Sequence, residues 1–92
     1  MAREGLPEYA ITPHAAFEME RRGLPPDVVR DILSNPGQRI AARSGRDVFQ
    51  SIVEHGEVRW LVRVIVDMDR RPPEVVTAYR TSKIEKYWRE RP

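Results

Sequence analysis

The 92-residue chain contains no cysteine and only two histidines, His14 and His55. The lack of cysteine excludes a disulfide framework, a thiolate zinc site and a cysteine nucleophile. Because the two histidines are far apart in the sequence, we expect no histidine-based transition-metal site. We expect no bound metal of another kind and no cofactor. The chain also has no apolar run near the ~20 residues of a membrane span, and its start, MAREGLPEYAI, lacks the apolar stretch of a signal peptide. We therefore expect a cytoplasmic protein that does not enter a membrane.

Charge of both signs is abundant but unevenly distributed. Residues 1–36 carry four Lys or Arg and six Asp or Glu, whereas residues 37–92 carry twelve and eight. Fourteen of the sixteen cations are arginine, the side chain suited to planar, bidentate contacts with phosphate. RNA is therefore an acceptable partner, although a GC-rich genome or selection for heat stability accounts for the same bias.

The first half of the chain predicts two helices. Thr12 suits the N-cap and Pro13 the first helical position, and the helix is expected to run to about Arg22, where Gly23 ends it. A second helix is expected within residues 24–37, LPPDVVRDILSNPG, starting at one of its first two prolines and ending at NPG.

From Gln38 onward the apolar residues alternate, which predicts strands. The turn SGR separates the first two strands, and His55 with Gly56 suits a two-residue hairpin loop, so we expect no catalytic role for His55. The tail TSKIEKYWRERP predicts a short helix capped by Ser82, and residues 8–11 have the pattern of a short edge strand. The four main strands are expected at 38–43, 47–54, 58–68 and 74–80. The single domain, residues 1–92, is thus predicted to be α+β, with two N-terminal helices, an antiparallel meander of about four strands, a short C-terminal helix and the helices on one side.

His14 is the first candidate for chemistry. At 100° per residue, His14, Glu18 and Arg21 fall within about 60° of one another, away from the apolar stripe of the same helix. The positive end of the helix dipole favours a neutral imidazole, which can act as a general base. His14 is equally explained as a surface residue paired with Glu18.

A second candidate lies in residues 76–88, VTAYRTSKIEKYW. Thr77 and Tyr79 are expected on one face of the last strand and Arg80 on the other face or at the strand's end. Hydroxyl and cationic groups at a strand-to-helix junction can hold a phosphate and stabilise a charged transition state. These residues are equally explained by capping, packing and solvation. The junction residues are Thr81, Ser82 and Lys83.

Arg59 and Arg63 share one face of the strand at 58–68 with two apolar residues. Arginines on a sheet face can support a nucleic-acid backbone, with aromatic side chains nearby to stack bases. They can equally cover the apolar residues beside them.

Two segments together resemble a prokaryotic family of small uncharacterised domains. Residues 14–36 resemble its pattern H-A-x-x-R-M-x-x-R-G-I followed by a helix ending in N-P, and residues 76–87 match its pattern V-T-x-Y-x-T-x-K-I-x-K-Y. The resemblance covers nearly the whole chain. The layout of the family is similar to that of RelE/ParE-type toxins and barnase-like ribonucleases, which implies RNA as substrate and an antitoxin protein as partner.

The resemblance implies an acid/base role for His14. Glu18 stands where the family usually has arginine, so either another arginine supplies that charge or Glu18 forms an acid/base couple with His14. The residues implied to hold the scissile phosphate are Thr77, Tyr79, Thr81 and Lys83, and the candidate replacements for the family arginine are Arg21, Arg22 and Arg80. The candidate nucleic-acid-binding residues are Arg21, Arg22, Arg59, Arg63, Lys86 and Tyr87.

Two hypotheses follow. In the first, the protein is a metal-independent endoribonuclease of the toxin type, in which the RNA 2′-hydroxyl attacks the adjacent phosphate, His14 or Glu18 moves protons, and Arg80 or Lys83 stabilises charge. In the second, the same fold is a non-catalytic module that holds a protein partner or self-associates through its sheet face or its C-terminal aromatic helix.

Overall fold

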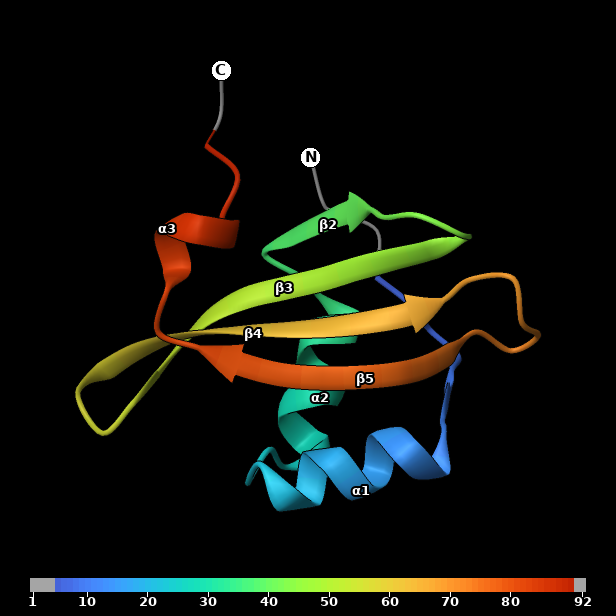
Figure 1. Ribbon diagram of the computed structural model, residues 1–92, viewed down its shortest axis with the longest axis horizontal. Helices are drawn as coiled ribbons and strands as arrows, with labels where there is room; N and C mark the ends of the chain where they lie inside the picture. The colour runs from blue at the N-terminus through green and yellow to red at the C-terminus, as the bar shows by residue number, and fades with distance from the viewer. Residues whose placement is uncertain (1–4, 91–92) are drawn as a thin grey trace.

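The computed structural model describes residues 5–90 as three helices and one five-stranded sheet (Figure 1). Residues 1–4 and 91–92, the outer ends of the expected domain, lie outside the described residues. In chain order the elements are β1 (Ala10–Ile11), α1 (Pro13–Arg21), α2 (Pro26–Ser34), β2 (Gln38–Ala41), β3 (Arg46–His55), β4 (Val58–Asp67), β5 (Glu74–Thr81) and α3 (Ile84–Tyr87).

The sheet has the strand order β1-β5-β4-β3-β2. Strands β2 to β5 form the antiparallel meander that the alternation predicted, and the α+β fold with two leading helices and a short final helix is confirmed. The strand count is five rather than four because β1 pairs in parallel with β5, at Ala10 with Glu74 and Ile11 with Val75. Strand β1 lies within the short edge strand expected at residues 8–11, whereas its parallel pairing with the distant β5 has no local signal in the sequence.

The helix signals in the first half are confirmed. The Thr12 hydroxyl accepts a 3.1 Å hydrogen bond from the backbone N–H of Ala15, as an N-cap does. Gly23 has a φ of +66°, the left-handed conformation that favours glycine after a helix. Helix α2 begins at Pro26 and ends before Asn35.

The turn between β3 and β4 lies one residue later than predicted. Its two residues are Gly56 and Glu57, with φ of +62° and +68°, which matches a hairpin turn with two left-handed residues. His55 is instead the last residue of β3 and pairs with Val58. The prediction that His55 is a turn residue is therefore wrong, because the strand ladder extends by one more pair.

The C-terminal helix is also capped differently from the prediction. Lys83 occupies the N-cap position without a side-chain hydrogen bond. The backbone N–H of Lys83 donates to the Thr81 hydroxyl at 3.1 Å, so Thr81, rather than Ser82, orders the junction between β5 and α3.

The sheet has an inner face, which packs against α1 and α2, and an outer face, on which α3 and the residues after it lie. Figure 1 shows α2 behind the sheet and α1 alongside β5. Val62, Val64 and Val66 of β4 point into the inner core, and Phe49 of β3 is fully buried there. Alternate residues of β4 face outward, so the side chain of Arg63 contacts Tyr87 of α3. The expectation that all helices share one side of the sheet therefore fails for α3.

No helix within residues 5–90 is both long enough and apolar enough to cross a membrane.

Candidate functional site

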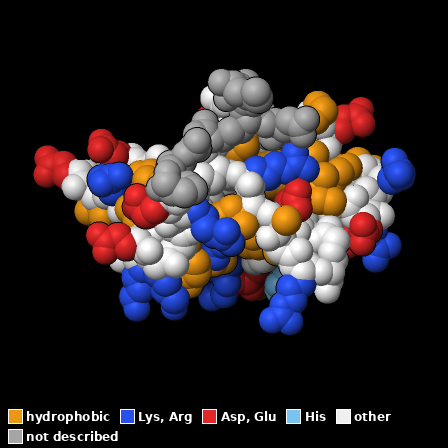
Figure 2. Space-filling model, turned by 90° about the horizontal axis from the view of Figure 1, so that it is seen from above, with side chains coloured by type: hydrophobic (Ala, Val, Ile, Leu, Met, Phe, Trp, Pro, Cys, Tyr) orange, Lys and Arg blue, Asp and Glu red, His pale blue; other side chains and the backbone are white. Residues whose placement is uncertain are grey.

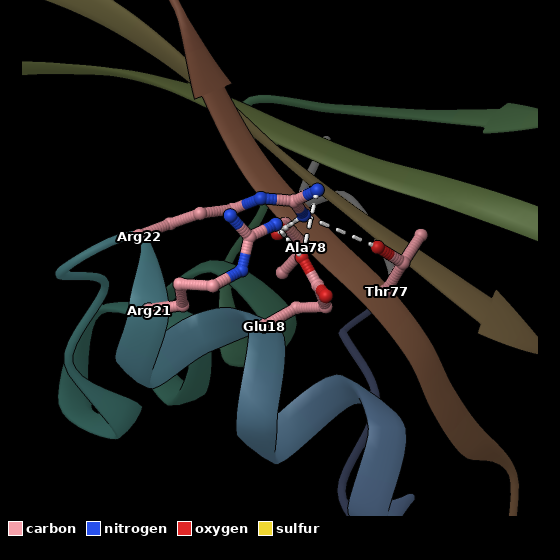
Figure 3. A network of polar contacts seen from close by, with 5 residues as sticks. All are labelled: Glu18, Arg21, Arg22, Thr77 and Ala78. Atoms are coloured by element: carbon pink, nitrogen blue, oxygen red, sulfur yellow. Dashed lines mark hydrogen bonds and ion pairs between the residues drawn. The ribbon is translucent and has the colours of Figure 1, made fainter.

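Charged side chains at the end of α1 contact the edge of β5 that does not pair with β4 (Figure 3). We call Glu18, Arg21, Arg22 and Thr77 the edge cluster. One carboxylate oxygen of Glu18, Oε1, lies 2.6 Å from Nη2 of Arg21 and 3.0 Å from Nη2 of Arg22. Nη1 of Arg22 donates to the carbonyl oxygen of Ala78 at 2.8 Å and lies 3.5 Å from the Thr77 hydroxyl. The edge cluster therefore ties the end of α1 to β5 and brings Thr77 beside Arg22.

Two hydrogen bonds at a single carbonyl explain why α1 lies beside β5. The backbone N–H and the hydroxyl of Thr12 both donate to the carbonyl oxygen of Val75, each at 3.1 Å. Beyond Val75, β1 no longer pairs with β5, so the strand edge is open and its Ala78 carbonyl accepts from Arg22 instead. The edge cluster thus satisfies a backbone group that a longer β1 would have paired.

The electrostatics of the edge cluster keep Glu18 ionised. The hydrogen bond from Arg21 and the positive charges of Arg21, Arg22 and His14 lower the pKa of the Glu18 carboxyl below its ordinary value of 4.5, against an opposing effect of partial burial. The Glu18 side chain is only 12% exposed, whereas that of Arg21 is 58% exposed. Glu18 is therefore a poor proton donor at neutral pH, and Arg21 presents its charge to solvent.

His14 lies one helical turn before Glu18 and is exposed. Among residues 5–90, His14 forms no hydrogen bond and no ion pair with another side chain, including Glu18, whose carboxylate is occupied by two arginines. The carboxylate–imidazole couple considered from the sequence is thus not formed here. His14 precedes Glu18 by four residues on α1, so both side chains lie on the same side of the helix, and the imidazole nitrogens are open to a ligand.

A row of polar side chains crosses the outer face, with one from each of β2, β3, β4 and β5. Arg63 of β4 donates through Nη1 to the Tyr79 hydroxyl of β5 and through Nε to Oε1 of Gln50 of β3, both at 2.8 Å. Gln50 in turn donates to Oε1 of Gln38 of β2 at 2.8 Å. We call these four residues the outer-face row. The register pairs Gln38 with Gln50, Gln50 with Arg63 and Arg63 with Tyr79.

The C-terminal segment 84–90 lies on the outer-face row and completes its hydrogen bonds. Gln50 donates to the backbone oxygen of Tyr87 at 3.2 Å. Gln38 donates to the backbone oxygen of Arg89 at 2.7 Å and accepts from its N–H at 3.1 Å. The Arg63 guanidinium lies 4.3 Å from the centre of the Tyr87 ring. Arg63, Tyr79 and Tyr87, all predicted site residues, are therefore engaged with one another.

Sequence reasoning missed Gln38 and Gln50. Gln50 is fully buried, and the usable signal is its position between the apolar pairs Val48–Phe49 and Ile52–Val53 of β3. A buried amide needs partners for both its donor and its acceptor atoms, which points to a polar network across neighbouring strands.

Beside the C-terminal segment, three cationic side chains line one shallow depression of about 500 Å³. Arg59 comes from β4, whereas Lys83 precedes α3 and Lys86 lies within it, with its Nζ 5.3 Å from the Tyr87 ring. Figure 2 shows Lys and Arg side chains in a row along the lower edge of that view. We call this depression the basic depression. Its lining is Arg59, Ser82, Lys83, Ile84, Glu85 and Lys86.

Arg80 lies apart from the other predicted phosphate-binding residues. It pairs with Val62, whose side chain is in the inner core, and its guanidinium lies 5.1 Å from the centre of the Trp60 ring. The predicted catalytic residues are thus divided. His14, Glu18 and Thr77 lie at the edge of β5, Tyr79 in the outer-face row, Thr81 and Lys83 at the end of β5, and Arg80 on the inner side.

The chain matches no protein-family profile, no curated protein and no solved structure. In the described part of the chain, no three His, Cys, Asp or Glu side chains gather in a group that could hold a metal ion.

Proposed function

We propose that the protein is a metal-independent endoribonuclease of the RelE/ParE toxin type, with the edge cluster and His14 as its catalytic centre. The observation that carries the proposal is the open imidazole of His14, one turn from a carboxylate that holds two arginines at the free edge of β5. General acid–base catalysis needs such a group within hydrogen-bond reach of the reacting oxygen.

In the proposed reaction, His14 accepts the proton of an RNA 2′-hydroxyl while that oxygen attacks the adjacent phosphorus. The new O2′–P bond forms as the P–O5′ bond breaks, and the departing 5′-oxygen takes a proton from water. The products are a 2′,3′-cyclic phosphate and a 5′-hydroxyl, and the imidazolium then returns its proton to solvent. Arg21, whose side chain is 58% exposed, stabilises the charge of the phosphorane.

Glu18 has a positioning role in this proposal. It stands where the resembling family has arginine, yet it holds Arg21 and Arg22 at one carboxylate oxygen. Two of the three arginines considered as replacements therefore lie at this place, and Arg80 does not. The edge cluster retains a net positive charge, which suits a phosphate.

The basic depression supplies a path for the rest of the RNA. Arg59, Lys83 and Lys86 come from separate segments yet line one surface, as expected for contacts with a phosphate backbone. These contacts position the RNA, whereas the edge cluster acts on one phosphate.

The test is cleavage of a single-stranded RNA by the purified protein in the presence of a metal chelator. Wild-type protein is expected to yield 2′,3′-cyclic phosphate ends, and His14→Ala is expected to be slower by about 100-fold or more. Glu20→Ala, an exposed change on the same helix, is the control and should cleave like wild type. Absence of cleavage by wild type, or equal rates for His14→Ala, would overturn the proposal.

A second candidate function, binding of a protein partner, is favoured by an apolar groove along α1 and its connection to α2. The groove measures about 580 Å³, and its walls include Ala16, Met19 and Leu24. Phe17, which follows Ala16 on α1, is 62% exposed. An apolar segment of an antitoxin fits such a groove. The C-terminal aromatic residues considered from the sequence serve this purpose less well, because Tyr87 is engaged with Arg63.

This second function is tested with the product of a neighbouring short reading frame. Phe17→Ser is expected to weaken co-purification of that product by about tenfold without altering the far-UV circular dichroism. Equal co-purification would contradict it, and dimerisation of the isolated chain would replace it with self-association.

A further inference from the structure

A small cavity lies on the inner side of the sheet, where β5 ends and the β3–β4 hairpin begins. It measures about 150 Å³. Most of its wall is apolar and comes from the α1–α2 connection and the two central strands, while three chemically distinct side chains share it: Trp60, His55 and Arg80. The full lining is Gly23, Leu24, Pro25, Val28, Val53, His55, Trp60, Val62 and Arg80.

Arg80 brings an uncompensated cation to this cavity. Its guanidinium lies over the Trp60 ring, 5.1 Å from the ring centre. Within residues 5–90 no hydrogen bond or ion pair engages its N–H groups, and no acidic side chain lines the cavity. An arginine held in place by an aromatic ring, with its donors open, is prepared to receive an anion.

The other walls fit a flat, uncharged ring. Indole and guanidinium planes both stack on nucleobases, and this contact needs no base pairing. The cavity has the scale of one base rather than of a folded peptide segment. A nucleotide has a flat ring and an anionic phosphate. The Trp60 ring and the apolar lining suit the ring, and the guanidinium of Arg80, unpaired among residues 5–90, suits the phosphate.

We propose that this cavity is a nucleobase subsite, in which an unpaired base of RNA lies against Trp60 and Arg80 while its phosphate bonds to Arg80 and His55. The choice of RNA as the ligand rests on the proposed ribonuclease function. The subsite adds to that function a means of selecting the sequence that is cleaved.

The position of the cavity suits this role. Gly23, in its wall, directly follows Arg22 of the edge cluster. Arg80 lies three residues beyond Thr77 on β5, roughly 10 Å at 3.3 Å per residue. A base in the cavity therefore belongs to a nucleotide close to the phosphate at the edge cluster.

The fluorescence of Trp60 provides a direct test, because the chain has only two tryptophans. In a Trp88→Phe protein, Trp60 is the sole indole. We expect saturable quenching by adenosine or uridine 5′-monophosphate at millimolar concentration and none by ribose 5-phosphate, which has the phosphate without the base. Calorimetric titration of the unmodified protein with the same nucleotides gives the affinity without any substitution.

Arg80→Gln is expected to weaken nucleotide binding by about tenfold or more, the loss expected for a hydrogen bond to a charged group. Arg43→Gln, an exposed change in the turn before β3, is the matched control and should bind like the parent. Circular dichroism shows whether both variants keep the fold.

The subsite is overturned if neither nucleotide binds, if ribose 5-phosphate quenches as strongly, or if Arg80→Gln binds unchanged. These outcomes are separate from those of the cleavage assay. RNA cleavage without nucleotide binding overturns the subsite alone, whereas nucleotide binding without cleavage overturns the proposed ribonuclease and leaves the subsite standing.

Discussion

Glu18 and Arg22 form an ion pair of 3.0 Å that connects the end of α1 to the edge of β5, because the same guanidinium donates to the Ala78 carbonyl. Arg21 shares the carboxylate oxygen but, within residues 5–90, forms no hydrogen bond or ion pair with β5. The two neighbouring arginines therefore differ in role. Arg22 holds the structure together, and Arg21 is available to a ligand.

This difference predicts opposite phenotypes for two adjacent substitutions. Arg21→Gln is expected to slow RNA cleavage by about 100-fold while changing the free energy of unfolding by less than about 0.5 kcal/mol. Arg22→Gln is expected to lower that free energy by about 1–2 kcal/mol, since the Ala78 carbonyl loses a charged donor. Urea unfolding and single-turnover cleavage check the pair, and identical stability losses in both variants would contradict the assignment.

The lowered pKa of Glu18 predicts a pH dependence of stability. A carboxyl group whose pKa is lower in the folded chain than in the unfolded chain stabilises the fold above its unfolded value, here 4.5, and loses that effect as the pH falls through the folded value. Wild type is therefore expected to have a higher Tm than Glu18→Gln at pH 7, and the difference should shrink below pH 4.5. Glu20→Gln, exposed on the same helix, should show no such trend in thermal melts from pH 2 to 7.

The outer-face row predicts a large cost for removing the Gln50 amide. Gln50→Leu deprives Arg63, Gln38 and the Tyr87 carbonyl of a partner at a fully buried position. We expect the free energy of unfolding to fall by about 2–3 kcal/mol. Glu54→Gln, exposed on the same strand, should change it by less than about 0.5 kcal/mol. A Gln50→Leu protein as stable as wild type in urea would show that the network contributes no net stability.

The β3–β4 turn predicts a stabilising substitution. Glu57 has a φ of +68°, a conformation that costs a residue with a Cβ atom about 1 kcal/mol and costs glycine little. Glu57→Gly is therefore expected to raise the free energy of unfolding by about 0.5 kcal/mol after the added freedom of glycine in the unfolded chain is subtracted. Gly56→Ala is expected to lower it by about 1 kcal/mol. Urea denaturation of both variants measures the two effects, and a destabilised Glu57→Gly would refute the turn geometry.

Local signals explain which parts of the fold were predictable. Thr12 and Gly23 act on their own helix, and the alternation of β4 depends on the strand alone, so the sequence predicted them correctly. The short edge strand at residues 8–11 is likewise predicted, but the parallel pairing of β1 with β5 and the register of the hairpin depend on partners elsewhere in the chain. No local pattern contains that information.

In the candidate site, too, the features set by local sequence were predictable and those set by distant partners were not. Helical spacing placed His14, Glu18 and Arg21 together, and strand alternation separated Arg80 from Thr77 and Tyr79. The ion pair between Glu18 and Arg22 and its link to Ala78 arise only from the packing of α1 on β5. The pairing of Arg63 with Gln50 likewise depends on strand register, which side-chain type does not specify.

The carbonyl oxygen of Val75 receives Thr12 from 63 residues earlier in the chain. Biosynthesis proceeds from the N-terminus, so His14 and Glu18 leave the ribosome long before the strand that completes their surroundings exists. A nascent chain without β5 has no edge cluster, whatever the state of α1. The proposed catalytic centre is therefore incomplete during translation and can form only after β5 has left the ribosome.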